Sequence, residues 1–207
     1  MRISRVYVEV ELVVGDSVTF DEDRNHYLKH VLRLKPGAAV ILFNGDGNDY
    51  STTIMVDGKR LSAMIESVIA CDVESKLHSS VIQAIGKADH LDWMIQKSTE
   101  LGVTQIQLFN AEHTQHQIKT AQRDKKLAHW RGVAISACEQ SGRAQVLEIL
   151  FHSNLLEALA ESKAELKLVL DFGGEPIPSF SVHAPASLAI LTGPEGGLSK
   201  TELEAAK

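Results

Sequence analysis

The chain has 207 residues, 44% of them apolar, and a formal net charge of −6, which allows one large domain or two small ones. The negative balance excludes a protein coated in positive charge, so any nucleic-acid contact would have to come from a local patch. Only the stretch from 87 to 145 is locally basic, with 8 Lys or Arg against 6 Asp or Glu.

The N-terminal sequence MRISRVYVEV lacks the apolar core and the small-residue cleavage site of a signal peptide. No stretch approaches the roughly 20 apolar residues of a membrane helix. The two cysteines, Cys71 and Cys138, lie at the edge of an expected strand and in an expected helix. Such positions fit reduced, buried thiols better than a disulfide, so we expect a soluble cytoplasmic protein.

Residues 1–72 alternate short β-branched runs with turn signals. The dipeptides Asp46-Gly47 and Asp57-Gly58 predict hairpins. The pattern indicates a small antiparallel barrel or sheet. One helix is expected within residues 21–37, with Tyr27, Leu28, Val31 and Leu32 on one face and Pro36-Gly37 as its stop.

From residue 78 onwards the pattern changes to alternating strands and helices, and we place the boundary between the two parts within residues 71–78. Helical spacing in residues 88–103 puts five residues on one face, ahead of a left-handed cap at Gly102; these are Leu91, Met94, Ile95, Ser98 and Leu101. Trp93 and Trp130 are assigned to the core. The alternation predicts a mostly parallel sheet covered on both faces, with ligands outside the carboxyl ends of its strands.

The sequence LAILTGPEGGLSKTEL, residues 188–203, reads as a strand, a glycine loop and a helix that Ser199 and Glu202 cap. Glycines at 193, 196 and 197 predict a close backbone approach by a ligand, although a plain turn is also possible. The loop matches neither G-x-G-x-x-G nor a phosphate loop. A second glycine-containing stretch, DFGG, follows another expected strand at Leu170.

The histidines offer no metal spacing, because His26/His30 and His113/His116 lack a third ligand nearby. We therefore expect no metal. The absence of a G-x-S-x-G elbow leaves a hydrolase without a nucleophile motif.

Four segments in order resemble the RsmE-type 16S rRNA (uracil-N3)-methyltransferases of the SPOUT superfamily. They are HYLKHVLRLKPG, QKSTELGV, ACEQSGR and LTGPEGGLS, and the resemblance covers essentially the whole chain. It implies a PUA-like β-barrel in residues 1–72 and a knotted SPOUT-type α/β methyltransferase domain in residues 73–207. It also implies a homodimer that uses S-adenosylmethionine.

The chain departs from the family pattern in two places. The usual Ser-Glu-Arg is replaced by Ala111, Glu112 and His113, so a guanidinium that binds phosphate in a bidentate manner becomes an imidazole. The family also continues beyond the position of Lys207, with a segment that closes the knot and completes the cofactor pocket. The resemblance thus predicts that this segment is missing, and that the 207-residue form folds without transferring methyl groups.

The resemblance assigns the cofactor to two loops. One is Leu170, Asp171, Phe172 and Gly173; the other is Leu191, Thr192, Gly193, Pro194, Glu195, Gly196 and Gly197. Proton removal from uracil N3 has three candidate bases, Glu195, Glu100 and Glu139. Ionisation of the imide beside a cation such as Arg143 is an equal alternative.

RNA contacts are expected from seven basic residues: Arg2, Arg5, His30, Arg33, Lys87, Lys97 and Arg143. The expected partner is 16S rRNA in the small ribosomal subunit, whose target base would be flipped into the pocket. The alternative from another functional class is a non-catalytic RNA-binding protein with a degenerate methyltransferase domain.

Overall fold

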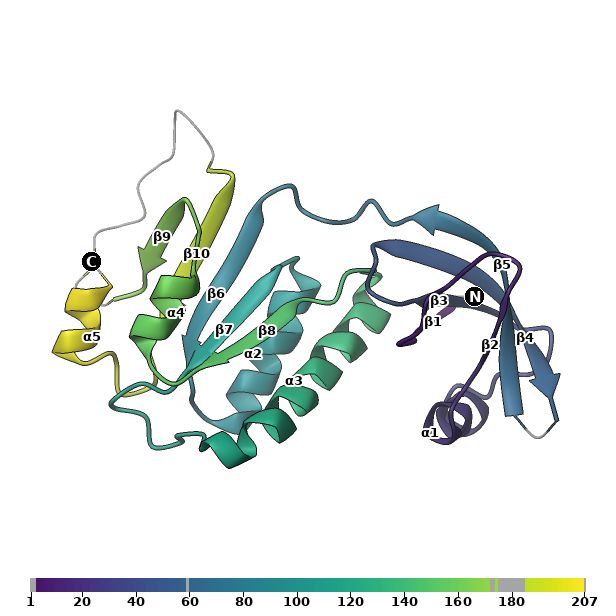
Figure 1. Ribbon diagram of the computed structural model, residues 1–207, viewed down its shortest axis with the longest axis horizontal. Coiled ribbons are helices and arrows are strands. Elements are labelled where there is room, and N and C mark those ends of the chain that lie inside the picture. Colours follow the sequence, from purple (N-terminus) through teal and green to yellow (C-terminus); the bar gives the residue numbers. More distant parts are fainter. Residues whose placement is uncertain (1–2, 59, 172–173, 175–184, 207) are drawn as a thin grey trace. The chain divides into compact units, whose positions relative to one another are not determined.

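The computed structural model describes residues 3–58, 60–171, 174 and 185–206 (Figure 1). The chain forms two compact units, the first comprising residues 1–74 and 138–145 and the second residues 75–137 and 146–207. Each unit contains one five-stranded sheet. The chain is therefore an α/β protein with a separate sheet in each unit.

The first unit carries a mixed sheet in the order β1-β3-β4-β5-β2. Its strands are β1 Ser4–Tyr7, β2 Ser17–Thr19, β3 Ala39–Phe43, β4 Asn48–Asp57 and β5 Arg60–Ala70. The β3–β4 and β4–β5 pairs are antiparallel, which confirms both predicted hairpins. The β1–β3 pair is parallel, so the sheet is mixed and the expectation of an antiparallel sheet is wrong for this pair. A long connection that contains β2 and a helix separates the two strands.

The predicted helix in residues 21–37 is present but irregular. It consists of α1, Glu22–His26, followed by one π-helical segment, η1, Tyr27–Val31. Leu28 is buried in the core as expected, whereas Val31 is 62% exposed. A π turn holds more residues than an α turn, so it rotates later side chains off the apolar face that regular spacing predicts. Arg33 then adopts a left-handed φ of 53°.

The second unit carries an all-parallel sheet in the order β8-β7-β6-β10-β9. Its strands are β6 His78–Ala84, β7 Gln105–Phe109, β8 Glu148–His152, β9 Leu166–Val169 and β10 Ser187–Thr192. The helices are α2 Ala88–Glu100, α3 Thr120–Ser141, α4 Leu155–Glu161 and α5 Lys200–Ala205, with the last residues of α3 belonging to the first unit. The predicted strand–helix alternation is confirmed.

Helices cover both faces of this sheet. On one face α2 and α3 contribute Ile95 and Trp130 to a cluster with Leu108 of β7. On the other face α4 contributes Leu155 to a cluster with Ile82 and Phe109, and Ala206 at the end of α5 packs against the same cluster. Alternate residues of β6 and β7 thus feed two separate cores, as expected for a strand buried on both sides.

Helix α2 has a narrower buried face than the sequence suggests. Leu91 and Ile95 are buried, but Leu101 is 83% exposed because the helix has ended before it. Trp93 is 64% exposed, so its assignment to the core is wrong. It lies two residues after Leu91, about 200° around the helix from it, and so points away from the sheet. None of the helices within the described residues is long and apolar enough to span a bilayer.

Candidate functional site

Four loops meet at the carboxyl edge of the parallel sheet. They follow β6, β7, β9 and β10, at residues 85–87, 110–119, 170–171 and 193–199. Because the strands are parallel, their carboxyl ends lie at one edge, the usual ligand site of such sheets. The predicted placement of the two cofactor loops on one rim agrees with this topology.

A groove of about 520 Å³ lies between the loops after β9 and β10. Leu170, Leu198 and Leu203 give it apolar walls, and Asp171 and Thr192 add a carboxylate and a hydroxyl. This volume is within the usual range for small-molecule sites. Apolar walls suit an adenine ring, a carboxylate and a hydroxyl can bind ribose, and negative charge favours a sulfonium. The residues present therefore fit S-adenosylmethionine.

The loop glycines have different structural roles. A Cβ on Gly193 would lie 3.0 Å from the Leu198 amide nitrogen, so the loop's own packing favours glycine there. Gly197 has a φ of +76°, which only glycine adopts readily. Gly196 does not line the groove; its Cβ position lies 3.6 Å from the Cβ and carbonyl oxygen of His113. Leu191 is buried with the second unit's core.

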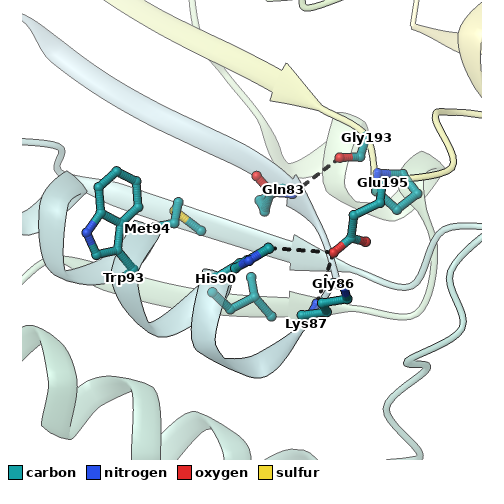
Figure 2. A pocket seen from close by; sticks show the side chains of 10 residues that line it. Gln83, Gly86, Lys87, His90, Trp93, Met94, Gly193 and Glu195 are labelled. Atoms are coloured by element: carbon teal, nitrogen blue, oxygen red, sulfur yellow. Dashed lines mark hydrogen bonds and ion pairs between the residues drawn. The ribbon is translucent and has the colours of Figure 1, made fainter.

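Glu195 lies at the start of helix α2, beside a second pocket of about 480 Å³ (Figure 2). Its Oε1 accepts a hydrogen bond from the Lys87 amide at 3.4 Å and lies 3.8 Å from His90 Nδ1. Hydrogen bonds from its own backbone N–H and from that of Lys87 lower the pKa of Glu195. Gly86 permits this approach, because a Cβ there would lie 3.2 Å from the carboxylate.

The three candidate bases are divided between the two units. Glu100 is at the opposite end of α2 from Glu195, about 18 Å along the helix, and is paired with Lys97 at 2.7 Å. Glu139 belongs to the first unit, where it accepts a hydrogen bond from the Tyr7 amide at 3.0 Å. Burial raises the pKa of Glu139. Of the two candidates in the second unit, only Glu195 lies at the rim of the groove.

Several predicted RNA-binding cations have carboxylate partners. The Arg143 guanidinium is 5% exposed and donates to both oxygens of Glu74, at 2.6–3.1 Å. Arg5 is paired with Asp49. Lys97 pairs with a carboxylate, as described above, whereas the side chains of His30, Arg33 and Lys87 are exposed.

The predicted sites at Arg2, Phe172 and Gly173 lie outside the described residues.

Two residues that lie at the rim are not among the site residues predicted from the sequence. Gln83, at the end of β6, donates from Nε2 to the Gly193 carbonyl at 3.4 Å. Glu202 forms the predicted capping box with Ser199, and its other oxygen accepts a bond from the Glu112 amide at 3.0 Å. The capping box is local and readable from sequence, but the contact with a loop 90 residues away is not. Within the described residues no group of three or more His, Cys, Asp or Glu could hold a metal ion.

Comparisons with known proteins give matches of one kind over nearly the whole chain. A family model described as an RNA methyltransferase domain matches residues 73–207, and one described as an RNA methyltransferase PUA domain matches residues 20–64. The ribosomal RNA small subunit methyltransferase E of Buchnera aphidicola subsp. Schizaphis graminum is 29% identical over 209 residues, covering 98% of this chain and 83% of that protein. The Bacillus subtilis protein of the same name is 27% identical, with 95% and 80% covered.

Two solved structures are similar over nearly the full chain. A putative methyltransferase from Legionella pneumophila, in complex with the bound cofactor SAM, has a TM-score of 0.90 at 31% identity and covers 100% of this chain and 86% of its own. A ribosomal RNA small subunit methyltransferase E from Neisseria gonorrhoeae, bound to S-adenosyl methionine, has a TM-score of 0.89 at 32% identity and covers 99% and 85%.

Proposed function

The chain belongs to the RNA methyltransferase family, and on this premise we propose that it transfers a methyl group from S-adenosylmethionine to small-subunit ribosomal RNA. The observation that carries the proposal is the groove at the carboxyl edge of the second sheet, where two loops combine apolar walls with Asp171 and Thr192. Two solved structures of the same fold contain this cofactor in their complexes.

We further propose the finer features that the family resemblance implies. The acceptor is N3 of a uridine in 16S rRNA, and the protein acts in the cytoplasm as a homodimer. The sheet of the first unit belongs to a PUA-like barrel over residues 1–72, and residues 73–207 form a knotted SPOUT domain. The five-stranded sheets and the match to a PUA-domain model support this organisation.

In this proposal the protein contributes positioning and electrostatics. The cofactor supplies an electrophilic methyl group on a sulfonium. Asp171 and Thr192 hold polar groups of the cofactor, while the leucines exclude water from one side of the groove. We assign Glu195 to holding the 193–199 loop against α2, because a carboxylate with a lowered pKa is a weaker proton acceptor.

The proposal is tested by titrating the full-length protein with S-adenosylmethionine in a calorimeter. We expect binding to the wild type and at least about tenfold weaker binding to Asp171→Ala, because a hydrogen bond to a charged group contributes about 1.5–3 kcal/mol. Asp124→Ala, an equal charge change at an exposed position on α3, is the matched control. Equal affinities for all three proteins would place the cofactor elsewhere.

A further inference from the structure

Three of the seven cations predicted to bind RNA, Arg5, Lys97 and Arg143, are paired with carboxylates, so we also considered other exposed basic residues. The sequence from Glu112 to Arg131 contains five Lys or Arg, three His and only two acidic residues, in a chain of net charge −6. Exposed basic residues of this stretch that form no ion pair with any described residue include His113, His116, Lys119 and Arg123. We call these four residues the β7–α3 basic surface.

The loop carrying this surface is anchored at defined points. Asn110, at the end of β7, forms two hydrogen bonds with the backbone of Ile118, at 2.9 and 3.0 Å. Thr114 donates from its hydroxyl to the Ile85 carbonyl at 2.6 Å. The anchoring residues are partly or fully buried, while His113, His116 and Lys119 between and beside them are exposed. The fold therefore presents these basic side chains from a fixed loop.

The surface lies at the same edge of the sheet as the cofactor groove. The backbone and Cβ of His113 are 3.6 Å from the Cβ position of Gly196, and the neighbouring Glu112 amide bonds to Glu202 at the start of α5. At the other end of the surface, Arg123 is close enough to His152, at the end of β8, to contribute to lowering its pKa, although burial is the main cause. The cations thus extend from the glycine loop towards the outer strand.

Few acidic groups compensate this charge. Glu112 and Asp124 are the acidic residues of the stretch, and the first turn of α3 contains none. Glu157, which also influences His152, is engaged at the start of α4, where it accepts a bond from the Ser153 amide at 2.9 Å. Uncompensated exposed cations beside a methyl-transfer groove are suited to a polyanion.

We propose that the β7–α3 basic surface binds phosphates of the substrate RNA next to the base that enters the groove. This inference rests on the proposed function and adds the surface by which the second unit holds its substrate. Phosphate contacts supply affinity and orientation and carry no sequence information themselves. The target uridine would then be selected by the groove and by the first unit.

The test measures binding of a 16S rRNA transcript as a function of salt concentration. We expect the Lys119→Ala/Arg123→Ala variant to bind more weakly at low salt and to show a slope of log K against log salt that is shallower by about 1.4, since each phosphate contact to single-stranded nucleic acid contributes about 0.7. The control is Lys163→Ala/Lys167→Ala, which removes two exposed cations from the same unit. Because both variants change the net charge equally, an effect of total charge alone would be the same in both.

A second variant tests the surface in the opposite direction. His113→Arg adds a permanent cation beside Gly196 and should steepen the salt slope by about 0.7. Affinity for S-adenosylmethionine should be unchanged in Lys119→Ala/Arg123→Ala, because these residues do not line the groove. Unchanged affinity also shows that the variant has folded.

The possible results separate this inference from the proposed function. If both the Lys119→Ala/Arg123→Ala and the His113→Arg variants show the wild-type salt slope and still methylate RNA, the surface does not bind RNA phosphates. The proposed function would then remain intact. Loss of binding to small-subunit particles with normal binding to the naked transcript would overturn it in favour of a ribosomal protein partner. Failure of the wild-type protein to bind or methylate RNA would contradict the function itself.

Discussion

Replacement of Arg143 distinguishes a structural from an RNA-binding role for the ACEQSGR segment. The Arg143 guanidinium and the Glu74 carboxylate are 5% and 19% exposed, and three hydrogen bonds join them. Removing one member of a buried pair typically costs about 3–5 kcal/mol, because the other charge is left unpaired. Glu74 retains some contact with solvent, so we expect Arg143→Ala to reduce the free energy of unfolding by ~3 kcal/mol.

Thermal unfolding followed by circular dichroism measures this change. At 2–4 °C per kcal/mol for a chain of this size, the melting temperature should fall by about 6–12 °C. The Arg143→Ala/Glu74→Ala variant should recover part of the loss, because it no longer buries an uncompensated charge. Lys97→Ala, which breaks a partly exposed pair on α2, should cost no more than about 0.5 kcal/mol.

A measurement of RNA binding gives the result that would contradict a structural role for Arg143. If Arg143 is structural, the folded variant should keep the wild-type salt dependence of binding. A normal melting temperature together with a shallower salt slope would refute the reasoning and assign the guanidinium to a phosphate.

Three other experiments test the groove and the buried thiol. Glu195→Gln should retain most methyl transfer, because the amide keeps an oxygen that can accept the hydrogen bond from the Lys87 backbone N–H. Glu195→Ala should lose much of the activity. Equal, near-complete loss in both variants would identify Glu195 as the base. Gly193→Ala should weaken cofactor affinity more than Gly196→Ala, because its Cβ would approach Leu198 at 3.0 Å while the other would make an ordinary contact; calorimetry showing the reverse order would contradict this. Burial raises the pKa of Cys138 to about 11, so about one thiol in a thousand is ionised at pH 8, and alkylation followed by mass spectrometry should require unfolding; rapid labelling of the native protein would show that the thiol is accessible.

The sequence predicted those features that depend on neighbouring residues. The capping box of Ser199 and Glu202, the left-handed cap at Gly102 and the two hairpins are set by side chains within a few positions of one another. Strand–helix alternation likewise predicted the parallel sheet, and with it the edge at which the groove lies.

Features that depend on distant residues or on irregular backbone could not be predicted in this way. The partner of Arg143 is 69 residues away, so its sequence position could not distinguish a buried ion pair from a phosphate contact. The sequence pattern places Trp93 on an apolar helix face, but it lies about 200° around α2 from the buried Leu91 and is exposed. Val31 was displaced by a π turn that periodicity does not reveal.

The most direct measurement of the central claim is methyl transfer to RNA. Full-length protein is incubated with S-adenosylmethionine carrying a labelled methyl group and with small-subunit particles that lack the modification, and the RNA is then digested to nucleosides. The account predicts label in 16S rRNA as N3-methyluridine. Label on another atom would contradict the proposed acceptor, and absence of label from a folded protein that binds the RNA would contradict the enzyme and favour a non-catalytic RNA-binding protein.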